Sequence, residues 1–100
     1  MKVKAKMKAD KVIVKVLAKH PMETGLRKDK NGGDLIPAKY IQELSCIHKE
    51  KLVFLAEFGR AVSKDPYIAF SFSGGQSGDT LALKWVDSMG DSKEVEAVIK

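Results

Sequence analysis

Cys46 and His48 are the residues whose types and spacing come closest to a catalytic pair in this chain of 100 residues. They lie two positions apart in a segment expected to form a strand, so both side chains point to the same face. A nucleophile and its base need about 2.6–3.2 Å between the reacting atoms, and a third group to orient the base. Two residues of strand rise separate the backbone positions by about 6.5–7 Å, which parallel side chains do not easily close. We therefore expect a packed thiol, a surface histidine and no catalysis by this chain alone.

Metal and disulfide chemistry have little support in the sequence. One cysteine cannot form an internal disulfide, and the two histidines are too far apart for a metal-ligand spacing. His20 and Met22 are soft-metal ligand types, but two ligands are too few for a site. We expect no metal and no cofactor.

Basic residues gather in the first third of the chain. The formal net charge is +5, yet residues 1–31 hold ten Lys and Arg against three Asp and Glu, a net charge of +7. Residues 32–100 hold eight Lys and Arg against ten Asp and Glu, a net charge of −2. This asymmetry indicates a positive face that attracts an acidic partner.

Alternating apolar and polar residues predict a series of short strands. In Lys2 to Lys8 every second residue is a lysine, the period of a half-buried strand, and such a lysine row protects an edge strand from pairing with other chains. We expect about seven strands in one domain of residues 1–100, an all-β, Ig-like β-sandwich with a small barrel as the second choice. The other expected strands are Lys11 to Lys19, Tyr40 to His48, Leu52 to Phe58, Tyr67 to Ser73, Thr80 to Asp87 and a last strand marked by Val95, Ala97 and Ile99.

The long polar segment from His20 to Lys39 is the feature that strand patterning does not explain. It contains three glycines and Pro37, and a loop this long in a small domain is usually functional. One interpretation is that His20-Pro21 shapes a turn while Met22 packs against the sandwich; the other is a recognition loop. Under the second, we predict partner binding by His20, Met22, Glu23, Thr24, Arg27 and Lys28.

Nucleic acid and membrane are weaker candidates as partners. Arg27, Lys28 and Lys30 form a basic cluster, but no helix-turn-helix, zinc-finger or KH signal and no aromatic stacking platform accompanies it. No apolar run approaches the roughly 20 residues of a transmembrane helix. The N-terminal residues also lack the apolar core of a secretory signal, so we expect no signal peptide in the chain itself.

Residues 20–29, with the sequence HPMETGLRKD, resemble a segment typical of the SoxZ family, a subunit of the SoxYZ sulfur carrier of thiosulfate oxidation. Further matches follow in order along nearly the whole chain. They are Ile36-Pro37-Ala38, Tyr40-Ile41-Gln42, Ala61-Val62-Ser63-Lys64, Pro66-Tyr67, Gly74-Gly75, Gly78-Asp79 and Trp85-Val86-Asp87.

The resemblance implies an Ig-like sandwich that forms a heterodimer with SoxY. In that family SoxY holds the sulfur intermediate on a cysteine in a mobile C-terminal tail, and other Sox enzymes visit it transiently. It implies a periplasmic location by co-export with SoxY. This chain ends without a comparable tail or cysteine, so we expect the supporting, non-enzymatic subunit. The alternative is a thiol-dependent sulfur transferase or single-chain carrier using Cys46.

Overall fold

Seven antiparallel strands and no helix make up the regular structure of the chain, in a computed structural model that describes residues 1–30 and 32–100. The strands are β1 (Lys2–Lys8), β2 (Lys11–Leu17), β3 (Ile41–His48), β4 (Lys51–Glu57), β5 (Tyr67–Ser73), β6 (Thr80–Asp87) and β7 (Ser92–Val98). Within the described residues, no helix has the length and apolar character needed to cross a membrane.

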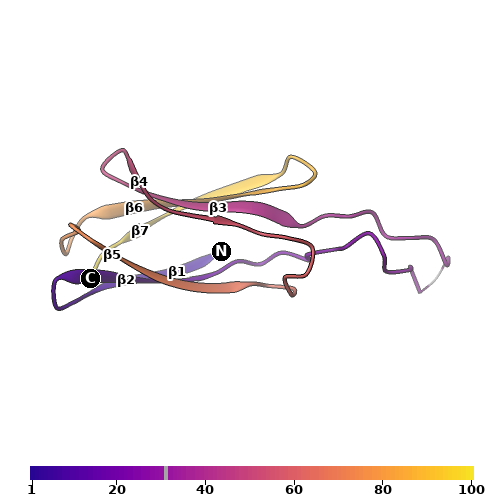
Figure 1. Ribbon diagram of the computed structural model, residues 1–100, viewed down its shortest axis with the longest axis horizontal. Coiled ribbons are helices and arrows are strands. Elements are labelled where there is room, and N and C mark those ends of the chain that lie inside the picture. The colour runs from indigo at the N-terminus through magenta and orange to yellow at the C-terminus, as the bar shows by residue number, and fades with distance from the viewer. Residues whose placement is uncertain (31) are drawn as a thin grey trace.

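The strands form two sheets that lie face to face. One sheet has the order β1-β2-β5 and the other the order β4-β3-β6-β7, and every paired neighbour is antiparallel. Figure 1 shows the two layers and a long extension at one end of the sandwich. The all-β sandwich predicted from the alternation of residues is confirmed.

The core lies between the sheets and is built by the alternate residues that point inward. Val12, Val14 and Val16 from β2 face Leu81 and Leu83 from β6, and all five side chains are essentially inaccessible to solvent. Each such side chain contributes roughly 1.5–3 kcal/mol through the apolar surface it removes from water. Phe54 of β4 stacks on Phe70 of β5 with ring centroids 3.9 Å apart, which joins the two sheets on one side.

Gly75 is required where the chain turns from β5 to β6 over one end of this core. A Cβ atom at this position would lie 2.5 Å from Cγ2 of Val12, closer than such atoms approach. Ile99 and Phe72 leave no room on the other sides. Only the smallest residue lets the turn close over Val12.

Strand boundaries follow the predictions to within a few residues. The Lys2–Lys8 strand has the predicted bounds, while β2 ends at Leu17 because Ala18 bonds to the loop before β5 through the carbonyl of Pro66. The last strand begins three residues before its first apolar marker, Val95, and ends one residue before Ile99, whose amide bonds to the carbonyl of Asp79 outside the ladder. The larger difference concerns the segment that was expected to be a loop.

Candidate protein-interaction surfaces

Residues 20–30 and 32–40, called the arm below, leave the end of the sandwich as two antiparallel limbs. Isolated bridges join Glu23 to Lys39 and Lys28 to Leu35. The Ile36 amide donates to the Arg27 carbonyl at 2.8 Å, between these two bridges. The segment is therefore an extended hairpin that projects beyond both sheets (Figure 1). Its backbone groups are partly satisfied by hydrogen bonds between the two limbs.

The base of the arm is fixed by His20, which is buried against the end of β6. The Nδ1 atom of His20 accepts a hydrogen bond from the Met22 amide at 3.0 Å. Nε2 then carries the ring proton and donates to Oδ2 of Asp87 at 2.9 Å. The imidazole also meets the edge of the Trp85 ring, with centroids 5.0 Å apart. The imidazole of His20 thus links two segments separated by 67 residues.

We call the contacts that hold His20 to the end of β6 the anchor of the arm. Asp87 lies at its centre, because each of its two carboxylate oxygens accepts two hydrogen bonds. Oδ1 accepts from the amides of Met89 and Asp91 at 2.9 and 3.0 Å. Oδ2 accepts from His20 and from Nζ of Lys39, the latter at 2.8 Å. Burial by itself would raise the pKa of the Asp87 carboxyl, but the hydrogen bonds outweigh it and lower this pKa to about 2.

Two more contacts hold the arm to the sandwich. The side chain of Met22 is buried in the core, and its sulfur lies 3.3 Å from the amide of Ile41, which donates to it. The backbone of His20 exchanges hydrogen bonds with Asp65 in the loop before β5: its amide donates to Oδ1, and its carbonyl accepts from the Asp65 amide. The predicted packing of Met22 against the sandwich is confirmed.

The outer part of the arm exposes both charge and apolar surface. Leu26 and Leu35 are 78% and 57% exposed, so they add apolar surface beside the cations of the arm. Arg27 forms an ion pair with Glu23 and remains largely exposed, as does Lys28. Beneath the arm, an open hollow of about 700 Å³ lies between it and the loop before β5. Its lining residues are Pro21, Met22, Glu23, Thr24, Arg27, Arg60, Ala61, Val62, Ser63 and Lys64.

The six residues predicted for partner binding therefore divide into two groups. His20 and Met22 are buried at the base of the arm, so they position the arm and do not form part of its exposed surface. Glu23 and Thr24 are half-buried, and Arg27 and Lys28 are exposed. Partner binding itself stays a prediction, carried by the exposed members.

Sequence reasoning did not single out Asp87 or Lys39 as members of a site. The signal for Asp87 was present, since it shares the inward parity of Leu81, Leu83 and Trp85 on one strand. A carboxylate at a core position requires a buried partner. In the structure this partner is His20.

A family model described as "Sulphur oxidation protein SoxZ" matches residues 1–98 of the chain. The chain belongs to the SoxZ family. It is therefore a component of the Sox system of sulfur oxidation. No curated protein matches the chain.

Within this SoxZ-family chain, Cys46 is enclosed by the core and shows no sign of reactivity. Its side chain is inaccessible to solvent, and burial raises the pKa of the thiol to about 11. His48 does not serve it as a base, because Nε2 of His48 pairs with Oδ2 of Asp79 at 2.8 Å. The expected packed thiol is confirmed, whereas the expectation of a surface histidine is wrong. His48 is buried, because its strand parity places it inward beside Phe72.

We expect Cys46 to react with a thiol reagent such as Ellman's reagent at least about 100-fold more slowly in the native chain than in urea at pH 8. A thiol with a pKa of about 11 is ionised to only about one part in a thousand at that pH, and the reagent has no path to it. Stopped-flow absorbance measures both rates. The control is Ser77→Cys in a Cys46→Ser background, which places a thiol in an exposed turn. Equal rates in native and unfolded wild type would contradict the burial.

The outer side of the four-stranded sheet carries a cluster of exposed apolar residues. Ile47 of β3 lies opposite Leu52 of β4, and the two are 42% and 54% exposed. Leu55 is 47% exposed nearby, and Ala82 of β6 lies opposite Ile47 on the other side. We call these four residues the apolar outer face. Contiguous apolar surface of this kind commonly marks a protein interface.

Proposed function

We propose that this chain is the non-catalytic subunit of a SoxYZ sulfur carrier, in which it binds SoxY and helps the Sox enzymes to dock. The observation that carries the proposal is the burial of its one thiol within a family whose chemistry is sulfur oxidation. A sulfur carrier needs a thiolate that is accessible and easily ionised. Cys46 offers neither, so the carrying cysteine belongs to the partner, at the C-terminus of SoxY.

The rigid sandwich and its arm suit the work of a docking subunit. A thiol on a mobile tail must be presented to several enzymes in turn, and each needs a constant surface to recognise. Binding residues carried by a stiff scaffold provide such a surface without a large loss of entropy on association. The arm has its base locked by His20 and Asp87, while its outer part offers Arg27, Lys28 and exposed leucines.

The apolar outer face fits the permanent partner. Stable heterodimers bury apolar surface at their centre, where lysine and glutamate are depleted. Ile47, Leu52 and Leu55 provide that character on one flat side of the molecule. The proposal includes a periplasmic location for the complex, reached by co-export with SoxY.

The alternative function is a thiol-dependent sulfur transferase or a single-chain carrier that uses Cys46. It requires a persulfide on a side chain that solvent does not reach and whose pKa is raised to about 11. A stable mass increase at Cys46 after incubation with a sulfur donor, absent in Cys46→Ser, would favour this alternative.

Co-expression with SoxY tests the proposal. We expect the two chains to elute as one heterodimer at micromolar concentration in size-exclusion chromatography. Leu55→Glu should break the complex, because it buries a charge in an apolar interface, whereas Ser77→Glu in a distant exposed turn should not. If the wild-type chains elute separately, the proposed function is wrong.

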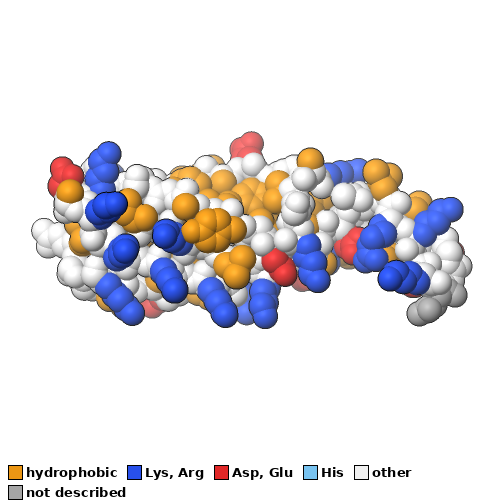
Figure 2. Space-filling model, turned by 90° about the horizontal axis from the view of Figure 1, so that it is seen from below, with side chains coloured by type: hydrophobic (Ala, Val, Ile, Leu, Met, Phe, Trp, Pro, Cys, Tyr) orange, Lys and Arg blue, Asp and Glu red, His pale blue; other side chains and the backbone are white. Residues whose placement is uncertain are grey.

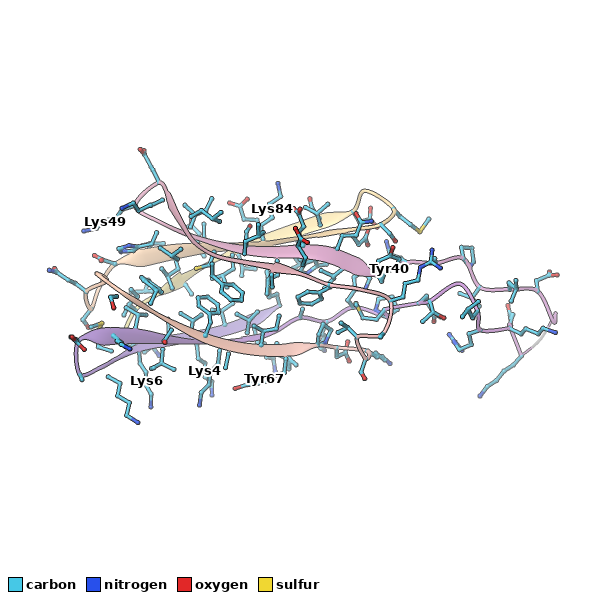
Figure 3. The ribbon with its side chains drawn as sticks, viewed as in Figure 1. Lys4, Lys6, Tyr40, Lys49, Tyr67 and Lys84 are labelled. Carbon is cyan, nitrogen blue, oxygen red and sulfur yellow. The ribbon has the colours of Figure 1, made fainter. Side chains whose placement is uncertain are left out.

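The same heterodimer allows a test of the arm. Reversing both charges in Arg27→Glu/Lys28→Glu should leave the heterodimer and its circular dichroism unchanged and slow sulfur turnover on SoxY about tenfold. Lys49→Glu/Lys51→Glu makes the same change in charge at the far end of the sandwich, where Figure 3 labels Lys49. Equal turnover in the two double variants would show that the arm has no role in docking.

A further inference from the structure

Six lysines cover the outer side of the three-stranded sheet. Lys2, Lys4, Lys6 and Lys8 come from β1, and Lys11 and Lys15 come from β2, whose valines occupy the inward positions. Figure 2 shows this side, with a row of lysines beside a strip of apolar side chains. In Figure 3, Lys4, Lys6 and Tyr67 extend from the sheet in the same direction. We call this surface the lysine face.

The lysine face places like charges directly opposite one another. Lys4 pairs with Lys15 and Lys8 pairs with Lys11 in the ladder between β1 and β2. Side chains at such positions are about 4.5–5.5 Å apart at Cβ, and like charges there destabilise a sheet. The facing residues of β5 are Tyr67, Ala69, Ser71 and Ser73, none of which is acidic. In the described part of the chain, none of the six lysines forms an ion pair.

Protection of a sheet edge accounts for only part of this arrangement. Lysines on β1 keep an edge strand from pairing with other chains. Lys11 and Lys15 lie on β2, which is the central strand and is hydrogen-bonded on both sides. No edge needs protection there. Their positions opposite other lysines add repulsion that the isolated chain does not need.

A hollow of about 560 Å³ continues the face toward β7. It lies between β1 and the C-terminal residues, and Lys4, Lys6, Lys15 and Lys100 line it. Glu96 is the acidic side chain among its lining residues. A carboxylate-rich loop entering this hollow would meet several ammonium groups at once.

We propose that the lysine face is an electrostatic docking surface for carboxylate-rich patches on protein partners that bind transiently. The proposal rests on the proposed function, in which the partners are the enzymes that visit the thiol of SoxY. Complementary charge raises the rate of encounter without the large dry interface of a permanent complex. Permanent burial of six ammonium groups would cost too much desolvation, so SoxY itself is assigned to the apolar outer face.

The chemistry of the face favours protein over nucleic acid. Single strands are held by successive aromatic side chains, and Tyr67 is the exposed aromatic residue on this side. Ile13 lies opposite Lys6, and Leu17 lies between Lys2 and Tyr67. Both apolar side chains are half-buried, so apolar surface alternates with ammonium groups along β2.

The test uses the reconstituted heterodimer with SoxY as the substrate of a sulfur-transferring Sox enzyme. The variant Lys4→Gln/Lys15→Gln removes two charges that lie opposite each other in the sheet. We expect the KM for the carrier to rise about tenfold at low salt and to lose most of its dependence on salt between about 20 and 300 mM NaCl. The kcat should be unchanged. The Tm should equal or exceed that of wild type, because a repulsive pair is gone.

Two control variants isolate the position and the charge. Lys49→Gln/Lys51→Gln removes the same charge at the β3–β4 hairpin and should keep the wild-type KM. Lys4→Arg/Lys15→Arg retains the charge and should have the wild-type KM. If both glutamine variants have the same KM and salt dependence, the lysine face is not a docking surface.

Other occupants give distinct outcomes. An unchanged KM together with loss of binding to a 20-nucleotide single-stranded DNA would overturn the proposal in favour of nucleic acid. An unchanged KM with loss of salt-sensitive self-association in sedimentation velocity would overturn it in favour of a second copy of this chain. Failure of the wild-type chain to bind SoxY rejects the proposed function and is seen before any lysine is changed.

Discussion

Replacing Asp87 with alanine is expected to lower the free energy of unfolding by about 3–5 kcal/mol. The carboxylate receives two backbone amides, the buried imidazole of His20 and the ammonium group of Lys39. Alanine leaves the buried donors without an acceptor, and the imidazole cannot reach water. Urea denaturation followed by tryptophan fluorescence measures the loss, since Trp85 packs on His20.

The arm should respond to this change more than the sandwich does. Hydrogen exchange at the amides of Met22 and Glu23 should accelerate in Asp87→Ala, because the anchor that holds both limbs is gone. Amides in the centre of β2 should keep their relative protection. The matched control is Asp91→Ala, which removes an exposed partner of Lys39 and should cost less than about 1 kcal/mol. Equal losses in the two variants would contradict the central position of Asp87.

The second expected result is a loss of about 2 kcal/mol of stability between pH 4 and pH 2, arising from the same carboxylate. The pKa of Asp87 is lowered from an ordinary value near 3.8 to about 2 in the folded chain. Between these values the unfolded chain binds a proton that the folded chain does not. Falling pH therefore favours unfolding in this range, and the contribution of Asp87 becomes nearly complete by about pH 5.

Thermal unfolding across this range, in wild type and in Asp87→Asn, isolates that contribution. Asparagine keeps the shape of the side chain but cannot titrate, so its Tm should fall less steeply than that of wild type. Asp79, whose pKa is lowered chiefly by its hydrogen bond to His48, contributes the same acid sensitivity to both proteins. Parallel curves for the two proteins would show that Asp87 is not the titrating group.

Together the anchor and the arm explain how this chain presents a fixed surface at one end of the sandwich. The groups with unusual environments in this chain, Asp87 and Cys46, stabilise the fold or lie inert within it. The groups that remain available to partners are the exposed cations and leucines of the arm, the apolar outer face and the lysine face. The proposed function assigns the chemistry on sulfur to SoxY and recognition to this chain.

Local periodicity was enough to predict the fold class of this protein. The alternation in Lys2–Lys8 and the inward valines of β2 are properties of neighbouring residues, and a period of two permits only a strand with one buried face. The packed position of Cys46 followed from the same pattern. Family membership was also accessible, because the segment from His20 to Asp29 is distinctive as a string of residues.

The contacts between residues distant in the chain, which build the anchor and the lysine face, could be known only from the tertiary structure. His20 and Asp87 are 67 residues apart and meet only when the two sheets close over the core. Bridges join the two limbs of the arm, and His48 pairs with Asp79 and not with Cys46. The lysine row was visible in the sequence as an edge strand, but its extension onto a central strand was not. Strand parity fixes which face a residue points to, whereas sheet order and register decide which residues stand beside it, and these depend on contacts distant in the chain.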